Sequence, residues 1–101
     1  MSSISMSTAL TGIGAAEERL RASAQNVANL STPGYRREAV SLATLPNEAG
    51  VKVSRAQEAQ AGVSAERELV EQRSATYSYV ANLRVLQTQI NTTGALLDIQ
   101  A

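Results

Sequence analysis

The chain is divided by the stretch ANLSTPGY, residues 28–35. Pro33 biases Thr32 away from the right-handed helical region, and Gly34 permits a positive φ. Asn29 has a side chain that can satisfy the polar groups a helix end leaves free. We therefore predict that a helix ends between Asn29 and Thr32 and that the chain then turns.

The residues before this turn predict one long helix, from about Ile4 to Leu30. Apolar or small residues recur there at alternating spacings of three and four, which is typical of a helix that packs against another helix. At about 1.5 Å per residue this helix is roughly 40 Å long. The seam consists of Met6, Ala9, Ile13, Ala16, Leu20, Ser23, Val27 and Leu30.

The middle of the chain, residues 35–63, loses the helical period. Two alternating runs, residues 39–45 and 51–55, flank the loop 46–50 and predict a small β-hairpin. The following stretch AQEAQAG, residues 56–62, indicates a flexible link or a helical turn. A two-stranded ribbon alone is marginal in water, so we expect it to rest on a partner surface.

A second long helix is predicted from about Ala65 to Ile99. Ser64 is a suitable N-cap, and Glu66 and Glu68 fall in the first turn, where the helix dipole favours acidic side chains. The spacing of three and four recurs along this segment. The seam consists of Leu69, Gln72, Thr76, Tyr79, Leu83, Leu86, Ile90, Thr93 and Leu97.

These segments predict a mainly α fold with two long antiparallel terminal helices, a coiled-coil-like hairpin and a short β-hairpin or loop insert. Its units are residues 1–34, 35–64 and 65–101. The 101 residues include no Trp or Phe and only three Tyr, which argues against a thick core. Two helices cannot cover both sides of their apolar seams, so we expect partner chains.

The composition argues against an enzyme. The chain has no His and no Cys, which removes the commonest general base, thiol nucleophiles and thiolate metal sites. We therefore expect no catalytic, cofactor-binding or metal-binding residues. The acidic pairs Glu17–Glu18 and Glu66/Glu68 are interpreted as solvated helix faces and dipole partners. The stretch 12–14 lacks the third glycine of a phosphate-binding loop.

Nine basic and nine acidic residues balance, which gives no general attraction to nucleic acid or anionic lipid. The N-terminus lacks the features of a secretory signal, and no stretch is long and apolar enough to span a bilayer. Two alternatives to a structural role stay open. One is a soluble helical-hairpin adaptor or regulator that binds a partner helix. The other is a nucleic-acid binder using Arg36, Arg37, Lys52 and Arg55.

The turn resembles the signature of the bacterial flagellar axial proteins, the rod and hook family. In that family a helix ends in Ala-Asn, two variable residues and Thr-Pro-Gly-Tyr, often followed by basic residues. The matching residues here are Ala28, Asn29, Thr32, Pro33, Gly34 and Tyr35, with Arg36 and Arg37 after them. The stretch YVAN, residues 79–82, is similar to the family's C-terminal Tyr-x-Ala-Asn pattern.

The resemblance covers about residues 3–37 and 66–99 and is greatest to the short proximal-rod proteins, although the middle segment is shorter still. It implies a structural subunit of the flagellar basal-body rod that self-assembles into a hollow axial tube. The implied partners are copies of itself, related rod proteins and the flagellar export apparatus, without nucleic acid or membrane insertion. The implied location is the periplasmic rod, reached by type III export without a cleaved signal peptide.

The resemblance also implies which residues form the contacts between subunits. In the family the terminal helices pair antiparallel, line the inner tube and order on assembly. The expected assembly interface consists of Met6, Ile13, Leu20, Val27, Leu69, Tyr79, Asn82, Leu83, Leu86, Ile90 and Leu97.

Overall fold

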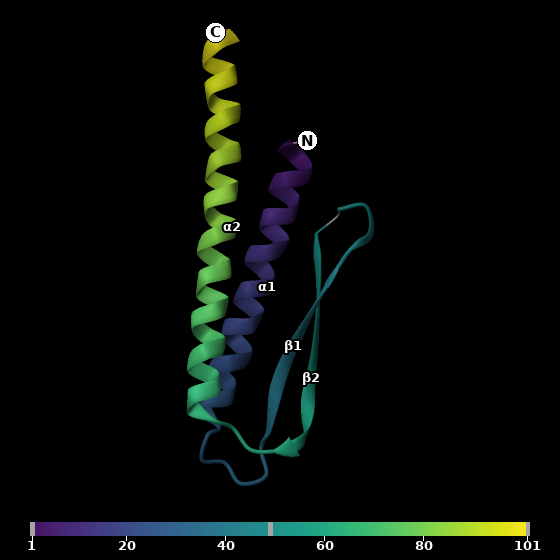
Figure 1. The fold of residues 1–101 in the computed structure, drawn as a ribbon, viewed down its shortest axis with the longest axis vertical. Helices are drawn as coiled ribbons and strands as arrows, with labels where there is room; N and C mark the ends of the chain where they lie inside the picture. The colour runs from purple at the N-terminus through teal and green to yellow at the C-terminus, as the bar shows by residue number, and fades with distance from the viewer. Residues whose placement is uncertain (1, 49, 101) are drawn as a thin grey trace.

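The structure, a computed structural model, describes residues 2–48 and 50–100 and is built from two helices and one hairpin (Figure 1). In chain order these are α1 (Ser2–Ala28), β1 (Arg36–Thr44), the short 3-10 helix η1 (Pro46–Glu48), β2 (Val51–Ala61) and α2 (Ala65–Gln100). The end residues 1 and 101 of the predicted units lie outside the described part. The molecule is a long, thin body that measures 63 × 25 × 14 Å.

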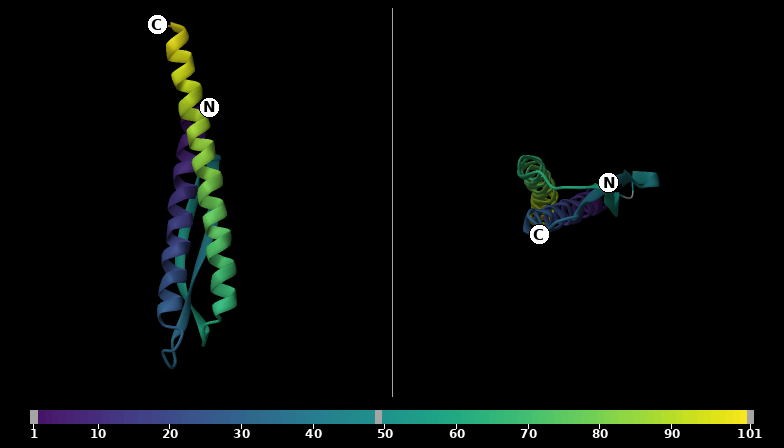
Figure 2. Two further views of the ribbon diagram at one scale, coloured as in Figure 1. Left: turned by 90° about the vertical axis from the view of Figure 1, so that its left-hand side faces the viewer. Right: turned by 90° about the horizontal axis from the view of Figure 1, so that it is seen from below.

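The expected fold class, a mainly α hairpin of terminal helices with a short insert, is wrong. The chain has an α-β-β-α arrangement in which the antiparallel two-stranded sheet is a full structural element. Its strands are 9 and 11 residues long and lie along α1, on the side away from α2 (Figures 1 and 2). The hairpin therefore forms a third layer, and α1 is the central element.

Residues 56–61 account for much of this difference. The sequence predicts a flexible link or a helical turn there, whereas the structure has the second half of β2. They are small or polar and carry no apolar alternation, so their strand conformation depends on pairing with β1. Ala56 pairs with Ala39, Gln57 with Glu38 and Ala61 with Arg36. Between the last two pairs the register shifts, because β2 uses more residues than β1 there, as in a β-bulge.

The predicted turn after α1 is present and rests on local chemistry. The Asn29 side chain donates from Nδ2 to the Gln25 carbonyl oxygen at 2.9 Å, and Thr32 Oγ1 donates to Asn29 Oδ1 at 3.1 Å. Gly34 has a φ of 76°, in the region that a residue without a Cβ adopts freely. The roles predicted for Asn29 and Gly34 are confirmed.

The helix α2 begins as predicted and extends past α1. Ser64 Oγ accepts a hydrogen bond from the backbone N–H of Arg67 at 3.3 Å, which confirms it as the N-cap. The helix has 36 residues against 27 in α1, and the two run antiparallel. The C-terminal end of α2 therefore projects beyond the N-terminal end of α1 (Figure 1).

The contact between layers is made by small side chains. Within the described residues, the buried apolar residues are all alanines: Ala9, Ala15, Ala16, Ala22 and Ala75. A Cβ placed on Gly12 would lie 2.6 Å from the Asn82 side chain, so the two helix backbones approach closely there. Burying an alanine removes little apolar area from water, so this core supplies little stability on its own.

Candidate functional site

A cluster of buried polar groups joins the three layers at the end of the molecule where α1 ends and α2 begins. Asn26 on α1 is fully buried, and its side chain bonds the backbone of Glu38 on β1 in both directions. Its Nδ2 donates to the Glu38 carbonyl oxygen at 2.9 Å, and its Oδ1 accepts from the Glu38 N–H at 2.8 Å. The Tyr35 hydroxyl donates to the same Oδ1 at 3.3 Å. Asn26 thereby fixes β1 on α1.

The centre of this polar cluster is an ion pair between Glu68 on α2 and Arg37 on β1. Glu68 is 0% exposed and Arg37 6%. Arg37 Nε donates to Glu68 Oε2, and Asn26 Nδ2 lies 3.3 Å from Glu68 Oε1. Ser23 Oγ donates to the Glu68 carbonyl oxygen at 3.3 Å. The interpretation of Glu68 as a solvated dipole partner is therefore wrong, because a strand contributes an arginine that the helical pattern does not reveal.

The surroundings of Glu68 act on its acidity in opposite directions. Burial disfavours the charged form and by itself raises the pKa of the carboxyl. The hydrogen bonds from Arg37, Ser23 and Asn26, together with the positive charge of Arg37, outweigh that effect. The pKa of Glu68 consequently lies below its ordinary value, and the group is a carboxylate at neutral pH.

A polar cavity of about 190 Å³ lies beside the polar cluster, lined by residues of α1, β1 and α2. The arginines in its lining are already paired: Arg19 with Glu71 at 2.6 Å, Arg67 with Glu58 at 2.9 Å, and Arg37 with Glu68. Residues 2–48 and 50–100 contain no group of three or more His, Cys, Asp or Glu side chains placed to hold a metal ion. Over that same part, neither helix combines the length and apolarity needed to cross a membrane.

The predicted family motif falls into two parts in the structure. Ala28 ends α1, and Asn29, Thr32, Pro33 and Gly34 form the turn that follows it. Thr32, Pro33 and Gly34 are exposed, whereas Tyr35 is half-buried and reaches back to the polar cluster. The motif thus combines a solvated turn with one anchoring side chain.

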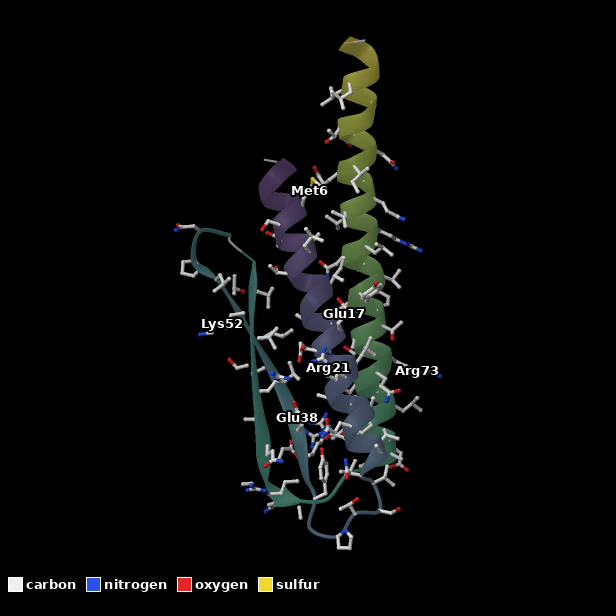
Figure 3. The ribbon with its side chains drawn as sticks, turned by 180° about the vertical axis from the view of Figure 1, so that it is seen from behind. Met6, Glu17, Arg21, Glu38, Lys52 and Arg73 are labelled. Carbon is white, nitrogen blue, oxygen red and sulfur yellow. The ribbon has the colours of Figure 1, made fainter. Side chains whose placement is uncertain are left out.

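The residues predicted as the assembly interface divide between contact and exposure. The half-buried ones are Met6, Ile13, Leu20, Tyr79, Asn82, Leu83 and Leu86. Asn82 contacts Gly12 on α1. Met6 lies between α1 and α2 (Figure 3). The exposed ones are Val27 at 43%, Leu69 at 54%, Ile90 at 52% and Leu97 at 62%. The α2 face nearest α1 carries Glu68, Ala75 and Asn82, so the apolar seam read from the sequence is rotated by about one residue from it.

The cations considered for nucleic acid are not gathered into one patch. Arg37 is buried in the polar cluster, and Arg55 pairs with Glu18 on α1 at 3.3 Å. Arg36 donates to Gln57 on the neighbouring strand at 3.3 Å, whereas Lys52 is exposed near the far end of the hairpin (Figure 3). The sequence predicted that these side chains lie together, but Glu68 on α2 and Glu18 on α1 pair with two of them.

Sequence reasoning missed a second surface on α2. We call it the α2 outer stripe; it consists of Leu69, Arg73, Tyr77, Val80 and Arg84. These residues are exposed, with Tyr77 at 79%, and they border shallow grooves on the helix. Arg73 points away from α1 and the hairpin (Figure 3). The spacing of four, four, three and four is itself helical, but the neighbouring seam of larger apolar residues obscured it.

In comparisons with known proteins, no family model matches this sequence and no curated protein shows significant similarity to it. The relation to flagellar axial proteins therefore stays a prediction that rests on residues 28–35 and 79–82.

Proposed function

We propose that this chain is a structural subunit that assembles with copies of itself and with related proteins, as a component of the flagellar rod. One observation carries the proposal: among the residues that the structure describes, the buried apolar ones are alanines, while large apolar side chains stay exposed along α2. Apolar surface that a chain does not cover itself is a common feature of protein–protein contact sites.

The distribution of the exposed apolar residues supports a role in assembly. They follow α2 along most of its length and continue onto the end that projects beyond α1. From the first turn of α1 outward, the exposed fractions on α2 are 52% for Ile90, 58% for Leu96 and 62% for Leu97. A projecting helix end of this kind has no surface of its own chain to rest on, so a neighbouring subunit is its natural contact.

The polar chemistry also suits a scaffold better than a catalyst. The buried groups of the polar cluster bond each other, and the pair of Glu68 and Arg37 connects α2 to the hairpin. Such an arrangement holds elements in register, which a building block requires. We therefore propose a structural and not a catalytic role.

Self-association tests the proposal directly. We expect the purified chain to form oligomers that grow with concentration in sedimentation velocity. Replacing Leu96 and Leu97 by Glu places charges on the projecting end and is expected to reduce that association. Replacing the exposed Gln87 by Glu and the exposed Asn91 by Asp, one to three turns earlier on the same helix, is the control for added charge. A wild-type chain that stays monomeric at all concentrations would exclude self-assembly and favour an adaptor that binds a foreign helix.

The rod assignment needs a separate test in cells. A tagged chain produced in flagellated bacteria is expected in the periplasm and in purified basal bodies, by the type III export route. A chain that remains cytoplasmic in flagellated cells would contradict the rod assignment, even if the purified protein assembles.

A further inference from the structure

The outer faces of the two helices carry opposite charges that the chain does not use. Glu17 on α1 and Arg73 on α2 are exposed, and neither belongs to any ion pair formed within the described residues. In contrast, Glu18 next to Glu17 pairs with both Arg21 and Arg55. Opposite charges on two surfaces are the pattern that steers and orients protein association.

The residues around these charges are complementary in size. We call Leu10, Gly14, Glu17 and Arg21 the α1 outer stripe. Leu10 is 54% exposed, and a Cβ placed on Gly14 would meet nothing within 4 Å. The α2 outer stripe carries the large side chain of Tyr77 at its middle. A bulky aromatic side chain on one surface and an open glycine on the other allow two helices to approach closely.

The spacing selects one orientation. Leu10 lies two helical turns before Glu17, and Val80 lies two turns after Arg73. An antiparallel crossing that brings Glu17 to Arg73 therefore also brings Leu10 to Val80. A parallel crossing about the same ion pair would instead bring Leu10 to Glu66 and Arg21 to Tyr77.

In the antiparallel crossing Gly14 and Tyr77 fall between those two pairs. Tyrosine is among the residues that most often dominate the energy of an interface, particularly near its centre. Tyr77 is 79% exposed in the single chain, so covering it removes a large apolar area from water.

We propose that the α2 outer stripe of one copy docks antiparallel on the α1 outer stripe of a second copy, with Arg73 facing Glu17 and Tyr77 over Gly14. The two stripes are different surfaces, so a pair still has one free stripe of each kind: the α1 outer stripe on one copy and the α2 outer stripe on the other. The contact repeats from copy to copy and builds an open-ended assembly. This inference rests on the proposed function and names the surfaces that carry it out.

Charge reversal with mixing tests the docking without disturbing the fold. Glu17→Arg alone and Arg73→Glu alone each place like charges opposite one another, and we expect a dissociation constant at least about tenfold higher. In an equal mixture every contact between unlike copies again joins opposite charges. The mixture is therefore expected to assemble as the wild type does, with the two variants alternating. Sedimentation velocity measures all three samples, and Lys52→Glu on the exposed hairpin is the control for reversed charge.

A steric variant keeps the test decisive if a charge reversal disturbs folding. Gly14→Leu fills the open site beneath Tyr77, and it improves the helix propensity of α1. We expect an unchanged or higher helicity by circular dichroism together with loss of association. If Gly14→Leu or the separate charge variants associate as tightly as the wild type, the docking is wrong and self-assembly uses another surface. If the wild type itself does not associate, the proposed function fails together with this contact.

Discussion

Replacing Glu68 by Gln leaves the buried guanidinium of Arg37 without its nearest anion. Removing one member of a buried ion pair costs about 3–5 kcal/mol, because the remaining charge stays desolvated. Glu58 Oε2 lies 3.6 Å from Arg37 Nη1 and is partly exposed, so it compensates in part. We therefore expect a loss near the lower end, about 3 kcal/mol. A small domain has a total stability of about 5–15 kcal/mol, so this loss is a large share of it.

The free energy of unfolding is measured by urea titration, with helicity followed by circular dichroism at 222 nm. Variants that are partly unfolded in buffer are titrated in the presence of a stabilising osmolyte. Lys52→Gln removes a charge at an exposed hairpin position outside both outer stripes and is expected to shift stability by no more than about 0.5 kcal/mol. Glu68→Leu combined with Arg37→Met removes both charges, and we expect it to be more stable than the sum of the single changes predicts. A loss below about 1 kcal/mol for Glu68→Gln, or additive single changes, would refute the reasoning.

Two further predictions concern the same layers. Gly12→Leu adds a side chain at a position where even a Cβ would lie 2.6 Å from Asn82, so we expect a destabilisation of about 1–3 kcal/mol in urea titrations. The matched change Gly14→Leu meets open space and is expected to leave the stability equal or higher. Acid is expected to destabilise the chain through Glu68, because the pKa of this group is lower in the folded state. The unfolded chain therefore binds the proton more readily, stability is lost as the pH falls from about 4.5 through the folded pKa, and melting curves of Glu68→Gln should lack that component.

Local signals in the sequence predicted the ends of elements well. Asn29 and Gly34 act through hydrogen bonds and backbone freedom within a few residues, and Ser64 caps α2 through its own next turn. These interactions do not depend on the rest of the fold. The sequence alone therefore predicts them.

The sequence did not predict the pairings between segments that lie far apart in the chain. Residues 56–61 become a strand because β1 pairs with them, and their own composition favours no such structure. The position of Glu68 in the first turn of a helix predicts a solvated side chain. The buried guanidinium that neutralises it comes from Arg37, on a strand far away in the chain.

The face that α2 turns toward α1 shows the same limit. Large apolar residues such as Leu69 and Ile90 predicted a seam between the helices, but they are exposed. The contact instead uses Ala75 and the approach of Gly12 to Asn82, where small side chains let the backbones come close. Hydrophobic periodicity identifies an apolar face without saying whether that face meets the same chain or another one.

Two long helices, separated by a turn after residue 28 and by a Ser64 cap, follow from the amino-acid sequence, since these signals act over a few neighbouring residues. The absence of His and Cys chemistry follows from it as well. Packing in three dimensions was needed to establish that the middle segment is a third layer on α1, that Glu68 is buried against Arg37, and which apolar residues stay uncovered. Those features depend on which distant surfaces meet, and the free energy that selects them is distributed over contacts between all three layers.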